Sequence, residues 1–110
     1  MKYINKIAEL SPDLPGAVEK DKDVRELFNG PRRRILEVRL RNSAVLTKHK
    51  AAEPITVQCI GGSGTFYAGP DLEDSLELRP GTLLTLEPGV EHEAAAEPEL
   101  HILVTRFKVE

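Results

Sequence analysis

Two of the three histidines stand where a metal ion or a polar ligand could be bound, and a carboxylate accompanies the first. His49 is followed four residues later by Glu53, within the stretch TKHKAAEPITVQCIGG, and His92 follows the turn-forming pair Pro88-Gly89. Imidazole nitrogens and carboxylate oxygens are common ligands of zinc and iron, and two histidines with one carboxylate form the facial-triad type of iron site. His49, His92 and Glu53 are therefore the candidate ligands of a divalent metal.

The same side chains have a simpler interpretation. A histidine on the inward face of a strand is more often a hydrogen-bonded pocket residue than a metal ligand, and a carboxylate at a strand end is usually solvated. Without a metal, His49 and His92 would hold water or the polar end of an organic ligand. Both interpretations place the two imidazoles in one pocket.

Three other residues carry less specific signals. Arg34 shares strand parity with Leu36, so it could point into the mouth of a barrel and meet an anionic ligand. Together with His49 and His92, it completes the predicted ligand-binding set. The only cysteine, Cys59, lies among apolar residues in the middle of a strand and is expected to be a buried small side chain. His101 falls on the outward face if the hairpin around the EPE turn is tight.

Short strands are the elements that would position these residues. Segments such as ILEVRL, ITVQCI and LHILVTRF alternate apolar and polar residues, and glycine and proline recur between them. Alternation with frequent turns is typical of an antiparallel all-β sandwich or barrel. The expected core comprises Leu36, Val38, Leu40, Val57, Ile102 and one of the neighbours Leu83 and Leu84.

The first 30 residues are expected to form a short helical or extended segment that packs on the barrel. INKIAEL and KDKDVRELF are the helix candidates, and Asn29-Gly30-Pro31 ends the second. The predicted organisation is an N-terminal segment over 1–30 and a single barrel domain over 31–110, since the chain has no room for a second core.

Composition restricts the partners. The chain has 110 residues, of which 40% are hydrophobic and 30% charged, as in an ordinary globular domain. The absence of tryptophan and a formal charge of −3 disfavour binding to nucleic acid. No apolar run is long enough to span a membrane, and a lone cysteine suits a reducing compartment. We therefore expect a cytoplasmic location and no membrane partner.

The order of these segments resembles the two motifs of the cupin superfamily. PITVQCIGGSGTFYAG and LELRPGTLLTLEPGVEH carry the likeness, which covers about residues 35 to 106. The resemblance implies a double-stranded β-helix, the cupin jelly-roll barrel. It also implies a divalent metal such as zinc, iron, manganese or nickel, bound by two histidines and a glutamate of the first motif and a histidine of the second.

The second motif matches this pattern more fully than the first. Gly81 opens it, and His92 stands at the position of the family's histidine. In the first motif His49 matches one histidine of the pair, but Thr47 and Ala51 occupy the alternative positions of the other. One imidazole of the family's set is therefore missing.

The glutamate of the first motif is also displaced. If Gly62 is the closing glycine, the family's glutamate falls on Ile55. Glu53 lies one step earlier on the same face of the strand, because side chains two apart share a face.

Three functions agree with these observations. The chain could be a metal-dependent cupin enzyme of the dioxygenase or isomerase type, a small-molecule-binding cupin without assigned activity, or an interaction or storage scaffold. The missing imidazole counts against the first, and the two retained histidines count against the third. The predicted function is binding of a small molecule in the barrel interior, with a divalent metal as an optional cofactor. The resemblance and the apolar N-terminal residues together predict a homodimer.

Overall fold

The fold is described by a computed structural model that covers residues 2–10 and 20–108. The described residues form seven antiparallel β-strands and no helix. The strands are β1 (Lys22–Asn29), β2 (Arg33–Leu40), β3 (Val45–His49), β4 (Ile55–Ala68), β5 (Asp74–Leu78), β6 (Leu83–Leu86) and β7 (His92–Phe107). The all-β class predicted from the alternating segments is confirmed.

The helix candidate KDKDVRELF is not helical, and β1 takes its place. β1 pairs antiparallel with β2, with a register shift between Glu26 and Phe28. The edge of β2 offers a row of backbone hydrogen-bonding groups. Pairing with them stabilises the segment more than a short isolated helix would. Residues 2–10 contain neither helix nor strand, which agrees with the extended alternative for INKIAEL. The division between 1–30 and 31–110 stays a prediction, and residues 1 and 11–19 of the first part lie outside the described residues.

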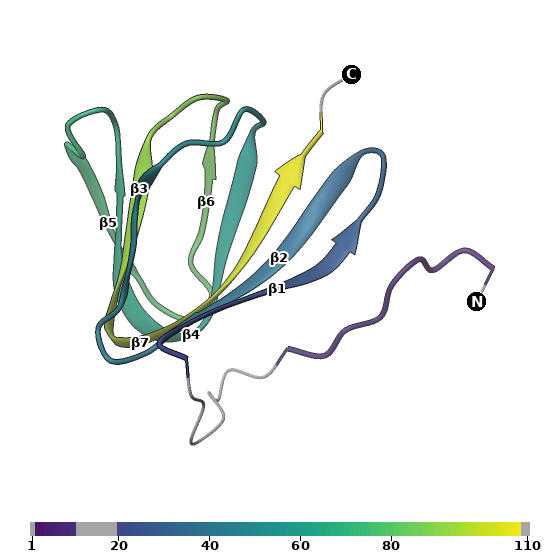
Figure 1. The fold of residues 1–110 in the computed structure, drawn as a ribbon, viewed down its shortest axis with the longest axis horizontal. Helices are drawn as coiled ribbons and strands as arrows, with labels where there is room; N and C mark the ends of the chain where they lie inside the picture. Colours follow the sequence, from purple (N-terminus) through teal and green to yellow (C-terminus); the bar gives the residue numbers. More distant parts are fainter. Residues whose placement is uncertain (1, 11–19, 109–110) are drawn as a thin grey trace.

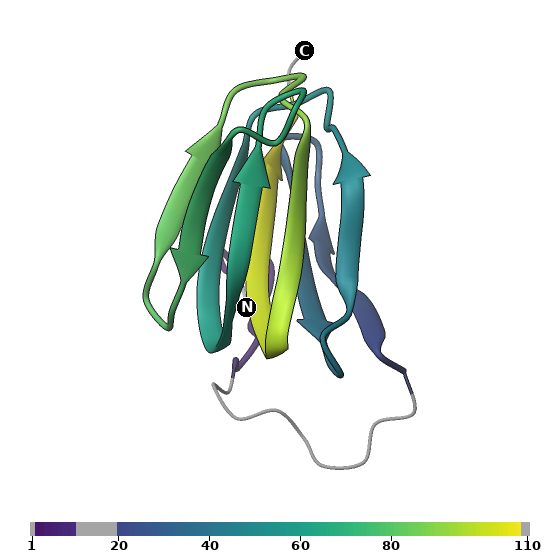
Figure 2. The same cartoon turned by 90° about the vertical axis from the view of Figure 1, so that its left-hand side faces the viewer.

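Two long strands organise the sheet. Its order is β1-β2-β7-β4-β5, with β3 paired to β7 and β6 paired to β4. The first half of β7 pairs with β3 and with the end of β4, whereas its second half pairs with β2 and with the start of β4. Both long strands bend, so the sheet wraps around an interior in the manner of a jelly-roll barrel (Figures 1 and 2).

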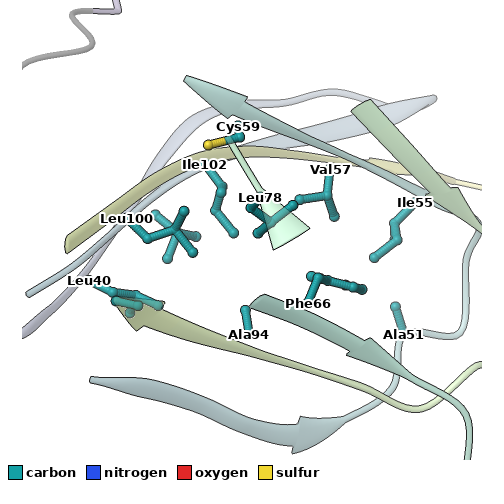
Figure 3. Packing of buried hydrophobic residues seen from close by; sticks show 12 residues of the cluster. Leu40, Ala51, Ile55, Val57, Cys59, Phe66, Leu78, Ala94, Leu100 and Ile102 are labelled. Carbon is teal, nitrogen blue, oxygen red and sulfur yellow. The ribbon is translucent and has the colours of Figure 1, made fainter. Parts of the chain in front are cut away.

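Apolar side chains from the inward faces fill that interior (Figure 3). The predicted core residues Val38, Leu40, Val57 and Ile102 are buried. Of the two neighbours in β6, Leu84 packs against the core, while Leu83 is 65% exposed. Leu36 is partly buried because it borders a cavity.

β4 and β7 approach each other closely at Gly62. The residue has a φ of 74°, in the left-handed region, and the Cβ of an alanine there would overlap the carbonyl oxygen of Glu99. Glycine is therefore required at Gly62 both by backbone conformation and by space.

Candidate functional site

The barrel interior holds a cavity of about 200 Å³ that is partly open to solvent. Its walls come from β1, β2, β3, β4 and β7 and from the segment after β3. Aliphatic side chains and Phe66 make up most of the lining, and its polar residues are His49, Lys50, His92 and Arg106. An apolar cavity with a few convergent polar groups is the usual form of a small-molecule site.

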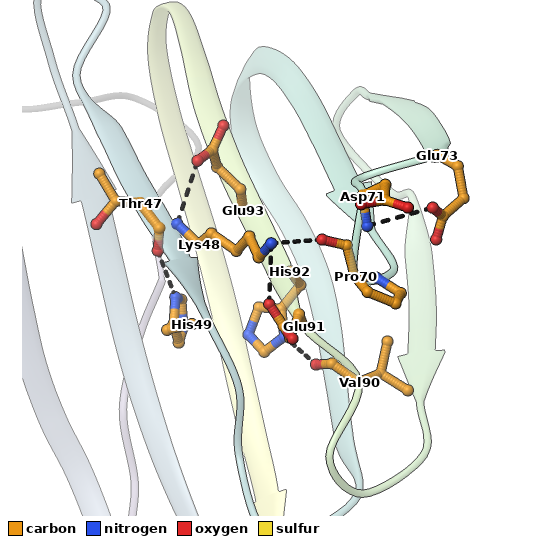
Figure 4. A network of polar contacts seen from close by, with 10 residues as sticks. All are labelled: Thr47, Lys48, His49, Pro70, Asp71, Glu73, Val90, Glu91, His92 and Glu93. Carbon is orange, nitrogen blue, oxygen red and sulfur yellow. Dashed lines mark hydrogen bonds and ion pairs between the residues drawn. The ribbon is translucent and has the colours of Figure 1, made fainter.

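His49 and His92 both line this cavity. Figure 4 shows their rings side by side. β3 ends at His49, β7 begins at His92, and the two residues are cross-strand partners. Their ring centroids lie 4.3 Å apart, with an angle of 64° between the ring planes. His92 also stacks on Phe66 at 5.6 Å and is 6% exposed, whereas His49 is exposed.

Backbone carbonyls fix the tautomer of both rings when they are neutral. Nδ1 of His49 lies 2.7 Å from the carbonyl oxygen of Thr47, and Nδ1 of His92 lies 2.9 Å from that of Val90. A carbonyl oxygen only accepts, so Nδ1 carries the proton in each ring. The Nε2 atoms are left as hydrogen-bond acceptors.

His92 is held in its neutral form. Burial lowers the pKa of His92, and the charges of His49 and Arg106 lower it further, which outweighs the opposite effect of the hydrogen bond to Val90. At neutral pH the Nε2 of His92 is therefore an acceptor.

Lys48, which does not line the cavity, holds the end of β3 against the start of β7. Its backbone N–H donates to Glu93 at 3.1 Å, and its ammonium group pairs with Glu91 at 3.1 Å and contacts the carbonyl oxygen of Pro70 (Figure 4). The two carboxylates that flank His92 in sequence are thus engaged by Lys48. They fix β3 against β7 and so keep the two imidazoles together.

Glu53, the predicted third metal ligand, is paired with an arginine. Nη2 of Arg106 lies 3.5 Å from Oε2 of Glu53, and Glu53 is not among the residues that line the cavity. The sequence reasoning missed Arg106. Continuing the alternation of Ile102 and Val104 by one more step would have placed it on the inward face.

Arg34, the arginine that the sequence singled out, is directed elsewhere. It is the cross-strand partner of Arg106, but its guanidinium pairs with Glu26, with Nη2 to Oε2 at 3.0 Å. Arg34 does not line the cavity. Its role in binding stays a prediction, and Arg106 holds the inward position.

Cys59 and His101 lie away from the cavity. Cys59 is a free cysteine, 1% exposed, and burial raises the pKa of its thiol, so it is the buried small side chain that was expected. His101 lies on the outward face of β7, yet it is fully buried. Its Nε2 lies 2.8 Å from Oε2 of Glu37, which also pairs with Arg25 at 2.7 Å and Arg39 at 3.4 Å. Burial would raise the pKa of Glu37, but the hydrogen bond to His101 and the two arginines together lower it.

The described residues do not complete a metal centre. Among them, no group of three or more histidine, cysteine, aspartate or glutamate side chains is placed to hold one metal ion. His49 and His92 do have the form of metal-binding histidines, because each Nδ1–H is held by a backbone carbonyl and each Nε2 is left as a donor for a metal. A zinc or iron site usually needs a third protein ligand, and Glu53 is engaged by Arg106.

Solved structures resemble this chain over most of its length. No family model and no curated protein matches it. A cupin superfamily protein from Desulfitobacterium hafniense is 13% identical, with a TM-score of 0.77 over 86% of this chain and 84% of that one. A cupin domain from Bordetella pertussis is 18% identical, with a TM-score of 0.68 over 86% of this chain and 100% of that one. A putative mannose-6-phosphate isomerase from Ralstonia eutropha is 16% identical, with a TM-score of 0.75 over 94% of this chain and 99% of that one. At these identities the likeness establishes the fold, which is the cupin barrel.

Proposed function

We propose that this cupin-fold barrel binds a small organic molecule in its interior. The observation that carries the proposal is the cavity of about 200 Å³, with an apolar wall and two imidazole Nε2 acceptors. Apolar walls supply affinity by removing ligand surface from water, and the few polar atoms fix orientation.

A metal-dependent cupin enzyme is the alternative, and one observation favours it. Both Nδ1 atoms are tied to backbone carbonyls, which is how metal-binding histidines are usually oriented. A divalent ion bound there would act as a Lewis acid toward the bound molecule. Because the described residues offer two donors, we expect any metal to be held loosely and to be lost on dialysis against a chelator.

Phenol and toluene test binding in the cavity. Each would be titrated to millimolar concentration while the methyl NMR signals of Val57 and Ile102 are followed, with exposed Leu83 as the control signal. We expect the two buried methyl groups to shift and Leu83 to stay constant, and phenol to bind more tightly because its hydroxyl can donate to Nε2. The proposal fails if neither probe moves the buried signals.

The metal content of untagged protein separates the two functions. We expect clearly less than one metal ion per chain, and unchanged phenol binding after chelation. A full equivalent of metal that disappears in His49→Ala and His92→Ala variants would favour the metal-dependent enzyme instead.

No described helix is long and apolar enough to cross a membrane. A cytoplasmic location remains part of the proposal, resting on the single cysteine.

A further inference from the structure

We infer that the ligand of this cavity is a small hydroxylated carboxylate whose hydrocarbon part is about the size of one ring. The inference rests on the proposed function, since it names the class of molecule that the same cavity takes. Arg106 binds the carboxylate, and the histidine pair accepts a hydrogen bond from the hydroxyl group.

Arg106 lines the cavity, and its guanidinium is only weakly engaged within the protein. Its Nε is covered by protein atoms, so the terminal nitrogens are the atoms that a ligand can reach. Its Nη2 reaches Glu53 only at 3.5 Å, the outer limit for a hydrogen bond. The Arg106 side chain is 29% exposed, and a carboxylate can accept from both terminal nitrogens of one guanidinium. A ligand carboxylate in the cavity would therefore pair with the terminal nitrogens of Arg106.

The histidine pair favours a hydrogen-bond donor of the ligand rather than a carboxylate. In the neutral rings both Nε2 atoms carry lone pairs, so a second carboxylate there would be repelled, while a hydroxyl or N–H group would donate to them. β7 begins at His92, turns through the base of the barrel, and carries Arg106 near its other end (Figure 1). The two polar sites thus stand at different parts of one cavity, and a ligand that satisfies both needs a polar group at each end.

The volume limits what lies between those ends. A cavity of about 150 Å³ lined by aliphatic and aromatic residues can hold benzene. A volume of about 200 Å³ therefore suits a single ring or a branched chain of similar size. Lys50 adds a second cationic side chain to the lining, and Glu53 lies outside it, so the lining favours an anion over a cation.

Four probes measure how much the carboxylate and the hydroxyl group of the ligand each contribute to binding. They are 3- and 4-hydroxybenzoate, 4-hydroxybenzamide, which has the same shape without the charge, and benzoate, which lacks the hydroxyl. We expect the better hydroxybenzoate to bind about 10- to 100-fold more tightly than the amide, because hydrogen bonds to charged groups are the stronger ones. Benzoate should bind several-fold less tightly than that hydroxybenzoate. Calorimetric titration of the full chain gives all four dissociation constants.

Two arginines provide a matched pair of variants. Arg106→Met should remove the preference for hydroxybenzoate over the amide, whereas Arg79→Met should retain it. Arg79 is the control because its guanidinium pairs with Glu77 and lies outside the cavity lining. His92→Phe should reduce the difference between hydroxybenzoate and benzoate.

The outcomes separate the two proposals. Equal binding of hydroxybenzoate and its amide to the wild-type protein, a comparison that needs no variant, overturns the inference and leaves the proposed function standing. Loss of the preference in Arg79→Met rather than Arg106→Met also overturns it. If neither the neutral nor the anionic ring-sized probes bind, the proposed function itself is wrong.

Discussion

His92 owes its chemistry to its surroundings rather than to its residue type. Phe66 covers one face of the ring, His49 contacts it from β3, and Arg106 adds a positive charge from the far end of β7. All three favour the uncharged ring, since burial and nearby positive charge both penalise imidazolium. The neutral ring with Nδ1–H on Val90 presents an acceptor to the cavity.

Stability should fall on mild acidification because of His92. Its folded-state pKa lies below the ordinary value of about 6.5, so the unfolded chain binds the proton first. The stability that depends on neutral His92 is full above about pH 6.5 and is lost as the pH falls through the folded-state pKa. Denaturant unfolding at about pH 7.5 and about pH 5 should show this loss in the wild type.

The His92→Gln variant is the control for this prediction. Its unfolding free energy should change less between the two pH values than that of the wild type. Glu37 contributes little in this range, because its pKa is lowered from an ordinary value of 4.5. Equal losses in both proteins would assign the acid sensitivity to another group.

The sequence reasoning named the two histidines that line the cavity, and it named Arg34 rather than Arg106, the arginine in the lining. His49 and His92 are found because motif spacing and strand parity agree on them. Arg34 and Arg106 have equal parity, and what separates them is the ion pair between Arg34 and Glu26. Glu26 lies in a segment that the sequence left open as helical or extended, so its position beside Arg34 was not available from sequence.

At the scale of elements, β1 shows that the local spacing of apolar residues can indicate the wrong type of secondary structure. Its spacing of apolar residues suits a helix, but Arg25 forms an ion pair with Glu37 of β2, which is buried beside His101 of β7. This contact and the backbone ladder with β2 depend on strands that are distant in sequence. The later segments were predictable because their alternation agrees with their pairing.

The close approach of β4 and β7 predicts unequal effects at two glycines. Gly62 and Gly89 both have positive φ, but only a Cβ at Gly62 meets another atom, the backbone carbonyl of Glu99. Gly89→Ala should cost about 1 kcal/mol from backbone conformation alone. Gly62→Ala should cost a further 1–3 kcal/mol, roughly, because β7 must shift. Denaturant midpoints measure both, and equal costs would mean that the strands separate freely.

At the scale of the molecule, the exposed apolar side chains call for an explanation. Tyr3, Ile4 and Ile7 of the N-terminal segment are mostly exposed, as is Val24 of β1, the strand at one end of the sheet order. An edge strand with apolar neighbours is a favourable surface for pairing. We therefore propose that two copies of the chain associate through this side, as a homodimer.

Light scattering at micromolar concentration tests the assembly. The wild type should have the mass of two chains, and the double variant Ile4→Asp, Ile7→Asp should have the mass of one. Leu76→Asp is the control, because Leu76 is exposed on β5 at the other end of the sheet order. A monomeric wild type, or a dimer that survives the double variant, would rule out this interface.

The pairing of β7 also determines when the barrel can form during folding. β7 is the last described strand, and β2, β3 and β4 all pair with it. A nascent chain that ends before His92 lacks the partner that joins β2 to β4, so only the local pairings β1–β2, β4–β5 and β4–β6 are open to it. Barrel closure therefore waits for β7 to leave the ribosome, and pairings this distant in sequence fold on the slower, millisecond-to-second scale. Until then the apolar faces of β2 and β4 are open to chaperones and to neighbouring chains.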